Sequence, residues 1–197
     1  MFHEIRRLVF IALFAALFIV MSAIKIDLGF TPVPITLQNL AVMLAGAFLG
    51  AGPGFASIAI VVALTATGLP LLHGQGGITY IAGPTGGFIL IFPVCALLIG
   101  FFAARLLRSE KFAGNRILLA IALFFVFELF GSALAYIGGV PWFMNVTGYS
   151  LERALAASCY PFLPGDAIKS LLAAILTVAL RPYLPAVRGY GNRRATE

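Results

Sequence analysis

The chain has 197 residues, of which 61% are hydrophobic and only 10% are charged, with a formal net charge of +6. A soluble domain has about 25% charged residues, so the composition excludes an ordinary soluble protein. No charged residue occurs between Asp27 and Arg105, a stretch long enough for several membrane spans. The apolar runs do not alternate with polar residues, so we predict an all-α integral membrane protein and not a β-barrel. The positive charge favours membrane lipid over nucleic acid as a partner.

Glycine and proline divide the apolar runs into six expected transmembrane helices. In chain order these cover residues 4–24, 37–49, 54–67, 85–107, 117–137 and 164–181, with a further short helix expected over 150–158. The second and third are short, so they must tilt, lie beside a cavity or fail to cross fully. We expect one six-helix membrane domain over residues 1–197.

The distribution of cations predicts the orientation of this bundle. With the N-terminus in the cytoplasm, ten of the thirteen Lys and Arg residues fall inside, two fall in outer loops, and Lys169 lies within the sixth span. Because basic residues collect in cytoplasmic loops, both termini are expected in the cytoplasm, with a basic tail over residues 182–197. The segments 25–36, 69–83 and 138–163 are then outer loops. The ten inner residues are Arg6, Arg7, Arg105, Arg108, Lys111, Arg116, Arg181, Arg188, Arg193 and Arg194.

A stiff, uncharged stretch follows the first helix and reads FTPVPITLQ over residues 30–38. Pro32 and Pro34 fix their own φ angles, lack an N–H donor, and push the preceding residues toward extended geometry. The stretch therefore cannot be helical, and we expect an extended apolar segment.

Glycine is dense in the expected outer segments 68–77 and 83–87. Glycine permits turns with positive φ and lets a ligand approach the backbone closely. A phosphate-binding loop would need Lys or Arg nearby, and this region has neither. Flexible turns explain the pattern as well as ligand binding does.

Asp166 and Lys169 lie near the start of the sixth expected span, just after Pro164. Three residues apart, they share one helix face. A charge at membrane depth costs about 2.5 kcal/mol or more and often marks a functional site. An acid and a base together suit a ligand that has hydrogen-bond donors and a carboxylate. The alternative is a structural ion pair in which Asp166 complements the helix N-terminus.

Two other titratable residues leave alternatives open. Glu128 lies in the middle of the fifth expected helix, where it either lines a cavity or bonds Ser132 one turn later. His73 is a lone histidine in an outer loop, and a solvated or hydrogen-bonded role is favoured over catalysis. Cys95 and Cys159 lack metal-ligand spacing and are interpreted as buried thiols.

Motifs of the common enzyme classes are missing from the sequence. It has no HExxH zinc motif, no GxSxG nucleophile motif, no acidic metal cluster and no nucleotide-binding loop. We therefore expect no catalysis, no metal and no cofactor, and any use of ATP must come from a partner. Ala12 and Ala16 place small residues one turn apart on the first helix, a spacing that permits close helix contact but also arises by chance.

Five segments, taken in order, resemble the BioY family, the biotin-binding membrane subunits (S-components) of energy-coupling-factor (ECF) transporters. They are TPVPITLQ (31–38), LAGAFLG (44–50), GLP (68–70), GPTGGF (83–88) and PFLPGDAIK (161–169). The resemblance implies six transmembrane helices with cytoplasmic termini, in agreement with the charge pattern. Leu71-Leu72-His73 stands where the family more often has Val-Phe-Ala.

The resemblance also implies a function: high-affinity biotin binding in an outer-face pocket capped by the loop around residues 30–38. Asp166 would accept the ureido N–H groups of biotin, and Lys169 would neutralise its carboxylate. The first helix would contact the ECF transmembrane scaffold, which works with a pair of ATP-binding-cassette ATPases in a bacterial or archaeal plasma membrane. The remaining implied residues are Gln38, Gln75, Thr85 and Gly86 for the substrate, Pro32, Val33 and Pro34 for the lid, and Ala12 and Ala16 for the scaffold.

Three other functions compete with this one. An S-component for a different vitamin would have the same fold and would be separated by a ligand panel. A lipid-modifying membrane enzyme is disfavoured by the missing catalytic residues. A pore or structural membrane protein would show conductance that does not depend on a ligand.

Overall fold

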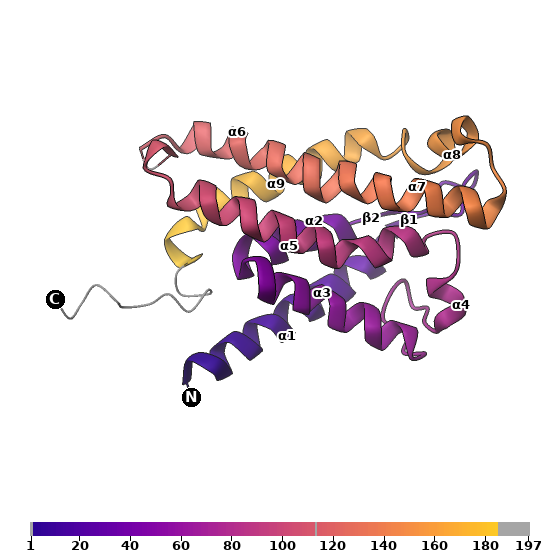
Figure 1. Cartoon of the computed structure of the whole chain (residues 1–197), viewed down its shortest axis with the longest axis horizontal. Coiled ribbons are helices and arrows are strands. Elements are labelled where there is room, and N and C mark those ends of the chain that lie inside the picture. Colours follow the sequence, from indigo (N-terminus) through magenta and orange to yellow (C-terminus); the bar gives the residue numbers. More distant parts are fainter. Residues whose placement is uncertain (1, 113, 185–197) are drawn as a thin grey trace.

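The computed structural model describes residues 2–112 and 114–184, and most of them are helical (Figure 1). This confirms the predicted all-α membrane fold. The helices are α1 (Phe2–Ala23), α2 (Gln38–Leu49), α3 (Ala51–Ala66), α4 (Ile78–Ile81), α5 (Gly86–Arg108), α6 (Arg116–Phe127), α7 (Leu134–Thr147), α8 (Leu151–Ser158) and α9 (Leu163–Ala179). The π-helical segment η2 (Glu128–Ala133) joins α6 to α7, and 3₁₀ turns lie at η1 (Glu110–Phe112) and η3 (Arg181–Tyr183).

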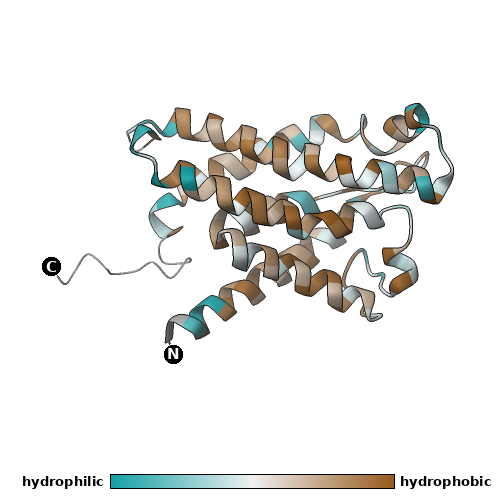
Figure 2. Cartoon of the chain, viewed as in Figure 1, coloured by the Kyte–Doolittle hydropathy of each residue, from teal (hydrophilic) through white to brown (hydrophobic). Residues whose placement is uncertain are grey.

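Three helical stretches of the described chain are long and apolar enough to cross a membrane: Glu4–Ala23, Gly86–Arg108 and Arg116–Thr147. Helices α8 and α9, bent by 48° at their junction, form a further candidate, whereas α2 and α3 are apolar but shorter. Figure 2 shows apolar residues along the helices and most polar residues near helix ends and connectors. The count of six spans stays a prediction.

The predicted outer loop at 138–163 begins later in the structure, because its first ten residues are helical. Helix α7 continues through Pro141 to Thr147 and ends at Gly148, which adopts φ +70°. Glycine and proline are tolerated inside membrane helices because neighbouring helices compensate for them. A Cβ atom at Gly138 or Gly139 would lie within 3.1 Å of α5 side chains, so these glycines serve close helix packing.

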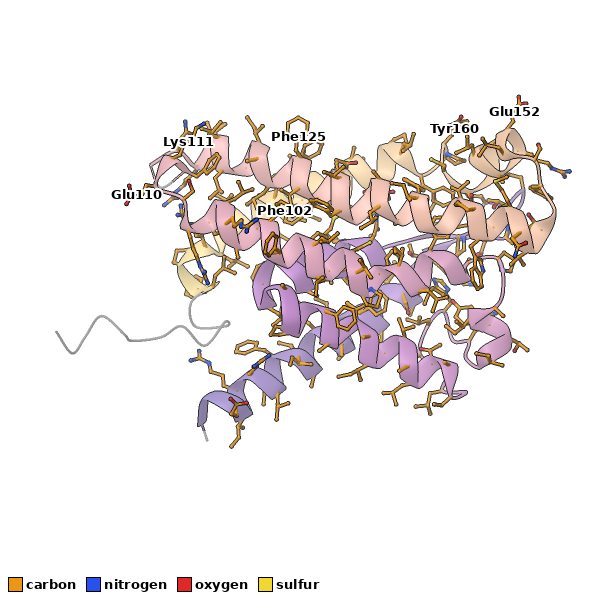
Figure 3. The ribbon with its side chains drawn as sticks, in the orientation of Figure 1. Phe102, Glu110, Lys111, Phe125, Glu152 and Tyr160 are labelled. Atoms are coloured by element: carbon orange, nitrogen blue, oxygen red, sulfur yellow. The ribbon has the colours of Figure 1, made fainter. Side chains whose placement is uncertain are left out.

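Polar residues gather at two opposite ends of the bundle. Figure 3 shows Glu110 and Lys111 at the α5–α6 connector, and Glu152 and Tyr160 at the other end. The start of α1 and η3 lie at the connector end, whereas α4 and α8 lie at the opposite end (Figure 1). The assignment of the connector end to the cytoplasm stays a prediction. Arg188, Arg193 and Arg194, which contributed to that prediction, lie outside the described residues.

Helix α5 lies in the interior and packs against α2, α3 and α7. The corner between α2 and α3 approaches it closely at Gly100. A Cβ atom at Gly100 would lie 2.4 Å from the backbone carbon of Gly50 and from the backbone nitrogen of Ala51. A Cβ atom does not approach non-bonded atoms so closely, so the contact between α5 and the α2–α3 corner requires glycine at position 100.

We expect Gly100→Ala to destabilise the bundle by about 1–3 kcal/mol, because the added methyl group forces backbone apart. Gly52→Ala is the matched control: Gly52 is also helical, but a Cβ atom added there would have no neighbour within 4 Å. Thermal unfolding of the two purified variants in detergent compares them directly. Equal melting temperatures would contradict the close approach at Gly100.

Candidate functional site

A buried ion pair lies near the start of α9. Lys169 Nζ is 2.8 Å from Asp166 Oδ1, and the two residues are only 8% and 5% exposed. Pro164 occupies the first turn of the helix, as the sequence predicted. The three-residue spacing places the acid and the base on one face of the helix, as predicted. The two side chains form an ion pair, which the structural alternative also predicted.

The Lys169 ammonium group is fully engaged within the protein. Besides Asp166, it donates to Asn39 Oδ1 at 2.8 Å and to the backbone carbonyl of Thr36 at 2.9 Å. An ammonium group has three N–H donors, so each has an acceptor. These bonds join α9 to the start of α2 and to the end of strand β2 (Ile35–Thr36).

The Asp166 carboxylate is equally engaged. Asn39 Nδ2 donates to Oδ1 at 2.9 Å, and the hydroxyl group of Tyr136 on α7 donates to Oδ2. Three helices thus meet at one polar cluster, which we define as Asn39, Tyr136, Asp166 and Lys169. The charges cancel, and each charged group has hydrogen-bond partners, which a buried ion pair needs to be tolerated.

A cavity of about 70 Å³ adjoins this polar cluster, and we call it the inner cavity. Its walls are mostly apolar, with a polar end formed by the cluster. This combination of an apolar body and a few convergent polar groups is typical of small-molecule sites. The lining residues are Val33, Pro34, Thr36, Gln38, Asn39, His73, Thr85, Phe88, Phe92, Gly131, Ala135, Tyr136, Ser158, Phe162, Asp166 and Lys169.

A larger and more polar cavity of about 400 Å³, the outer chamber, lies next to the inner cavity. Pro34, His73 and Thr85 line both, so they form the boundary between the two. The remaining residues of the outer chamber include Lys25 and Asp27, whose side chains form a partly exposed ion pair at 3.3 Å.

The stretch 30–38 is not helical until its last residue, as predicted. Strand β1 (Lys25–Ile26) pairs antiparallel with β2 (Ile35–Thr36), so the residues between them form a hairpin. Val33 is 9% exposed and lines the inner cavity with Pro34, whereas Pro32 lines the outer chamber. The hairpin therefore forms part of the walls of both cavities.

The other predicted substrate residues separate into three groups. Gln38 and Thr85 line the inner cavity. Gln75 lines only the outer chamber. Gly86 lines neither: a Cβ atom there would lie 1.8 Å from the carbonyl oxygen of Ile81, so the glycine permits tight packing at the start of α5.

Ala12 and Ala16 line neither cavity and lie on the exposed face of α1. The opposite face of α1 buries Phe14 and Phe18 in the core. The predicted alanine pair is thus available to another helix or to lipid.

Sequence reasoning missed two members of the polar cluster, Asn39 and Tyr136. Asn39 follows Gln38 at the start of an otherwise apolar helix, and that isolated polar pair was a usable signal. Tyr136 follows Glu128 and Ser132 at four-residue intervals, which indicates one polar helix face.

Glu128 follows neither of the two alternatives drawn from the sequence. It does not line the inner cavity, and its Oε1 is buried with no hydrogen-bond partner among the described residues. Ser132 Oγ is buried and has no hydrogen-bond partner among the described residues. Within those residues, no group of three His, Cys, Asp or Glu side chains could hold a metal ion.

His73 has the hydrogen-bonded role that the sequence favoured. Its Nδ1 lies 2.6 Å from the hydroxyl oxygen of Tyr80. Burial lowers the pKa of His73, and the positive charge of Lys25 lowers it further. Burial also raises the pKa of Tyr80 to about 12. Both groups are therefore neutral at pH 7.

Comparison with known proteins identifies relatives over nearly the whole chain. Residues 1–186 match the model of the BioY family. The biotin transporter BioY of Rhizobium etli is 37% identical over 186 residues, which cover 92% of this chain and 97% of the relative. That of Rhodobacter capsulatus is 35% identical, with coverages of 92% and 96%.

A solved structure supports the same relationship. The crystal structure of the S-component for biotin from an ECF-type ABC transporter superimposes with a TM-score of 0.79 and 31% identity, covering 91% of this chain and 92% of that one. The family and these relatives are transporters, which confirms the prediction that the chain is a multi-pass membrane protein and not an enzyme. The resemblance drawn from the five sequence segments is confirmed, and the chain belongs to the BioY family.

Proposed function

We propose that this chain is the high-affinity biotin-binding subunit of a vitamin uptake transporter and that it holds biotin in the inner cavity. The observation that carries the proposal is the polar cluster of Asn39, Tyr136, Asp166 and Lys169 at one end of an apolar cavity. Biotin has a compact apolar ring system with a ureido group, which matches this division. The names of the relatives and of the solved S-component support the same ligand.

The ureido group can replace hydrogen bonds that the residues of the polar cluster make with one another. Its N–H groups are donors for the Asp166 carboxylate, and its carbonyl oxygen is an acceptor for an amide, hydroxyl or ammonium donor. Because the cluster is already internally bonded, binding replaces existing hydrogen bonds by new ones. The net gain per bond is therefore modest, and the apolar walls supply the remaining affinity.

Isothermal titration of the purified protein should show biotin binding without ATP or metal. Asp166→Asn should weaken binding by about 1.5–3 kcal/mol, or roughly ten- to a hundredfold, because a charged acceptor in a desolvated site becomes neutral. Glu152→Gln is the matched control, since Glu152 is exposed on α8 and lines neither cavity. Binding of another vitamin in place of biotin would contradict the proposed substrate.

The hairpin around residues 30–38 acts as a lid over the biotin site. Val33 packs with the apolar residues of α7 and α8 and with Phe162, so the hairpin already contacts the walls that a ligand would touch. Pro32 and Pro34 restrict the chain in the open state, which lowers the entropy cost of ordering it on closure.

Replacing Pro32 and Pro34 together by Gly should accelerate biotin release about fivefold or more, because the closed lid loses its pre-organisation. Association should change less. Stopped-flow displacement of a labelled biotin measures both rates. Pro182→Gly, at the opposite end of the bundle in η3, provides the control for a general loss of stability. Unchanged release in the double variant would show that the segment is not the lid.

The chain works with an ECF transmembrane scaffold and a pair of ATP-binding-cassette ATPases in the plasma membrane, with both termini in the cytoplasm. The S-component match supports this partnership. The exposed alanine pair of α1 lets a scaffold helix approach closely. The chain itself has no nucleotide-binding loop, so the energy must come from the partners.

Ala12→Trp combined with Ala16→Trp should abolish co-purification with the scaffold and leave biotin affinity unchanged, because the bulk blocks helix approach at a face that lines neither cavity. The control places the same pair on another exposed face: Ile121→Trp with Phe125→Trp on α6, where Phe125 points away from the bundle (Figure 3). Retention of the scaffold by the α1 variant, or equal loss in both, would refute the assignment.

A further inference from the structure

His73 occupies a strained backbone position at the tip of a tight turn. Leu72 and Gln75 exchange backbone hydrogen bonds, and the two residues between them, His73 and Gly74, adopt φ angles of +56° and +71°. Such a two-residue turn favours Asn or Gly at both positions. Within the described residues, His73 alone has a positive φ without being glycine. Strain of this kind persists where the surrounding structure holds it in place, and it clusters at functional sites.

The surroundings hold both the backbone and the ring of His73. Its backbone N–H donates to Ser22 Oγ of α1 at 3.3 Å, which fixes the turn against that helix. Its ring lies edge-to-face with that of Tyr80 on α4, at 85° and 6.2 Å between centroids. The 2.6 Å contact between Nδ1 and the Tyr80 hydroxyl group sets the rotation of the imidazole.

The Tyr80 hydroxyl group allows the tautomer of His73 that carries its proton on Nε2. Burial raises the pKa of Tyr80 to about 12, so its hydroxyl group keeps its proton and is able to donate it to Nδ1. Burial lowers the pKa of His73, so the ring is neutral. A neutral imidazole that accepts at Nδ1 has its proton on Nε2.

In this tautomer Nε2 carries a hydrogen-bond donor. Nε2 is buried and has no hydrogen-bond partner among residues 2–112 and 114–184. His73 lines both the inner cavity and the outer chamber, so this donor lies at their boundary. Lys25 and Asp27 of the outer chamber and Tyr80 are the charged or titratable groups that face it.

The Lys169 ammonium group is a poorer partner for a ligand carboxylate, because it has no unbonded donor. Its three donors already have acceptors, and the adjacent Asp166 carboxylate would repel a second anion. A ligand carboxylate at Lys169 would have to displace an existing acceptor and lie beside the Asp166 charge, whereas Nε2 of His73 has no partner to displace. Of the two residues considered as carboxylate partners, His73 has an unbonded ring nitrogen and Lys169 has no unbonded donor.

We propose that the Nε2–H of His73, assisted by the positive charge of Lys25, binds the carboxylate of the ligand. The fused rings of biotin then lie in the inner cavity against the polar cluster, and the carboxylate tail extends past His73 toward the outer chamber. This inference rests on the proposed function and gives His73 the part that the family resemblance had suggested for Lys169.

The experiment compares the affinities of biotin and of its neutral primary amide for wild-type protein and for His73→Asn. Asn tolerates the left-handed backbone, so the turn is retained, but its shorter side chain withdraws the donor from the cavity. Biotin should lose about tenfold or more in affinity, as expected for a hydrogen bond to a charged group, and the amide should lose about threefold or less. Asp166→Asn should instead weaken both ligands.

Tyr80→Phe tests the same point without changing the histidine or its turn. Without the tyrosine donor, the ring no longer favours the Nε2–H tautomer, and biotin should lose about three- to fivefold relative to the amide. Equal losses of both ligands in both variants, or a loss selective for biotin only in Lys169→Met, would overturn the assignment. If the wild-type protein binds no biotin, the proposed function itself fails; if it binds biotin without any selective effect of His73, only this inference fails.

Discussion

The need to compensate one buried ammonium group organises the region around the candidate site. Lys169 is buried between helices, where an unpaired charge is costly, and its three donors reach Thr36, Asn39 and Asp166. These acceptors come from the end of strand β2, from α2 and from α9 itself. Tyr136 adds α7 through the other oxygen of Asp166. Elements distant in sequence are therefore held together by the requirement that neither charge be left without partners.

This arrangement connects the polar cluster, the proposed ligand site, to the hairpin, the proposed lid. The carbonyl of Thr36 belongs to β2, and β2 pairs with β1 to form the base of the hairpin. A ligand that accepts a hydrogen bond from Lys169 would compete with the Thr36 carbonyl, whose bond to Lys169 holds this base in place. In the proposed function, ligand binding and hairpin position would therefore depend on a shared interaction, which a lid formed by an independent loop would lack. The two prolines keep the segment stiff, so a displacement at its base is transmitted to Val33.

Sequence patterns predicted the features that depend on short-range spacing. Prolines at 32 and 34 indicated an extended segment, and the separation of Asp166 from Lys169 placed them on one helix face. Asn39 and Tyr136 could not be assigned in this way, because their contacts with Asp166 span 127 and 30 residues. The π-helical segment η2 adds a further obstacle. It changes the rotation of α7 relative to α6, so Tyr136 reaches the polar cluster whereas Glu128 does not line the inner cavity. A regular helical wheel would not reproduce that difference.

The two ends of the proposed ligand meet elements of different rigidity. The polar cluster is built on α2, α7 and α9, whose side chains are buried and mutually bonded, so it can position a ligand accurately. The groups at the outer boundary come from a tight turn and from the hairpin, which are connecting segments at the end of the bundle. In the proposed function, a rigid inner site would favour discrimination between ring systems, whereas the connecting segments at the outer boundary would govern entry and release. Affinity differences among related ligands with the same tail should therefore arise at the cluster, and differences in residence time should arise at the boundary formed by Pro34, His73 and Thr85.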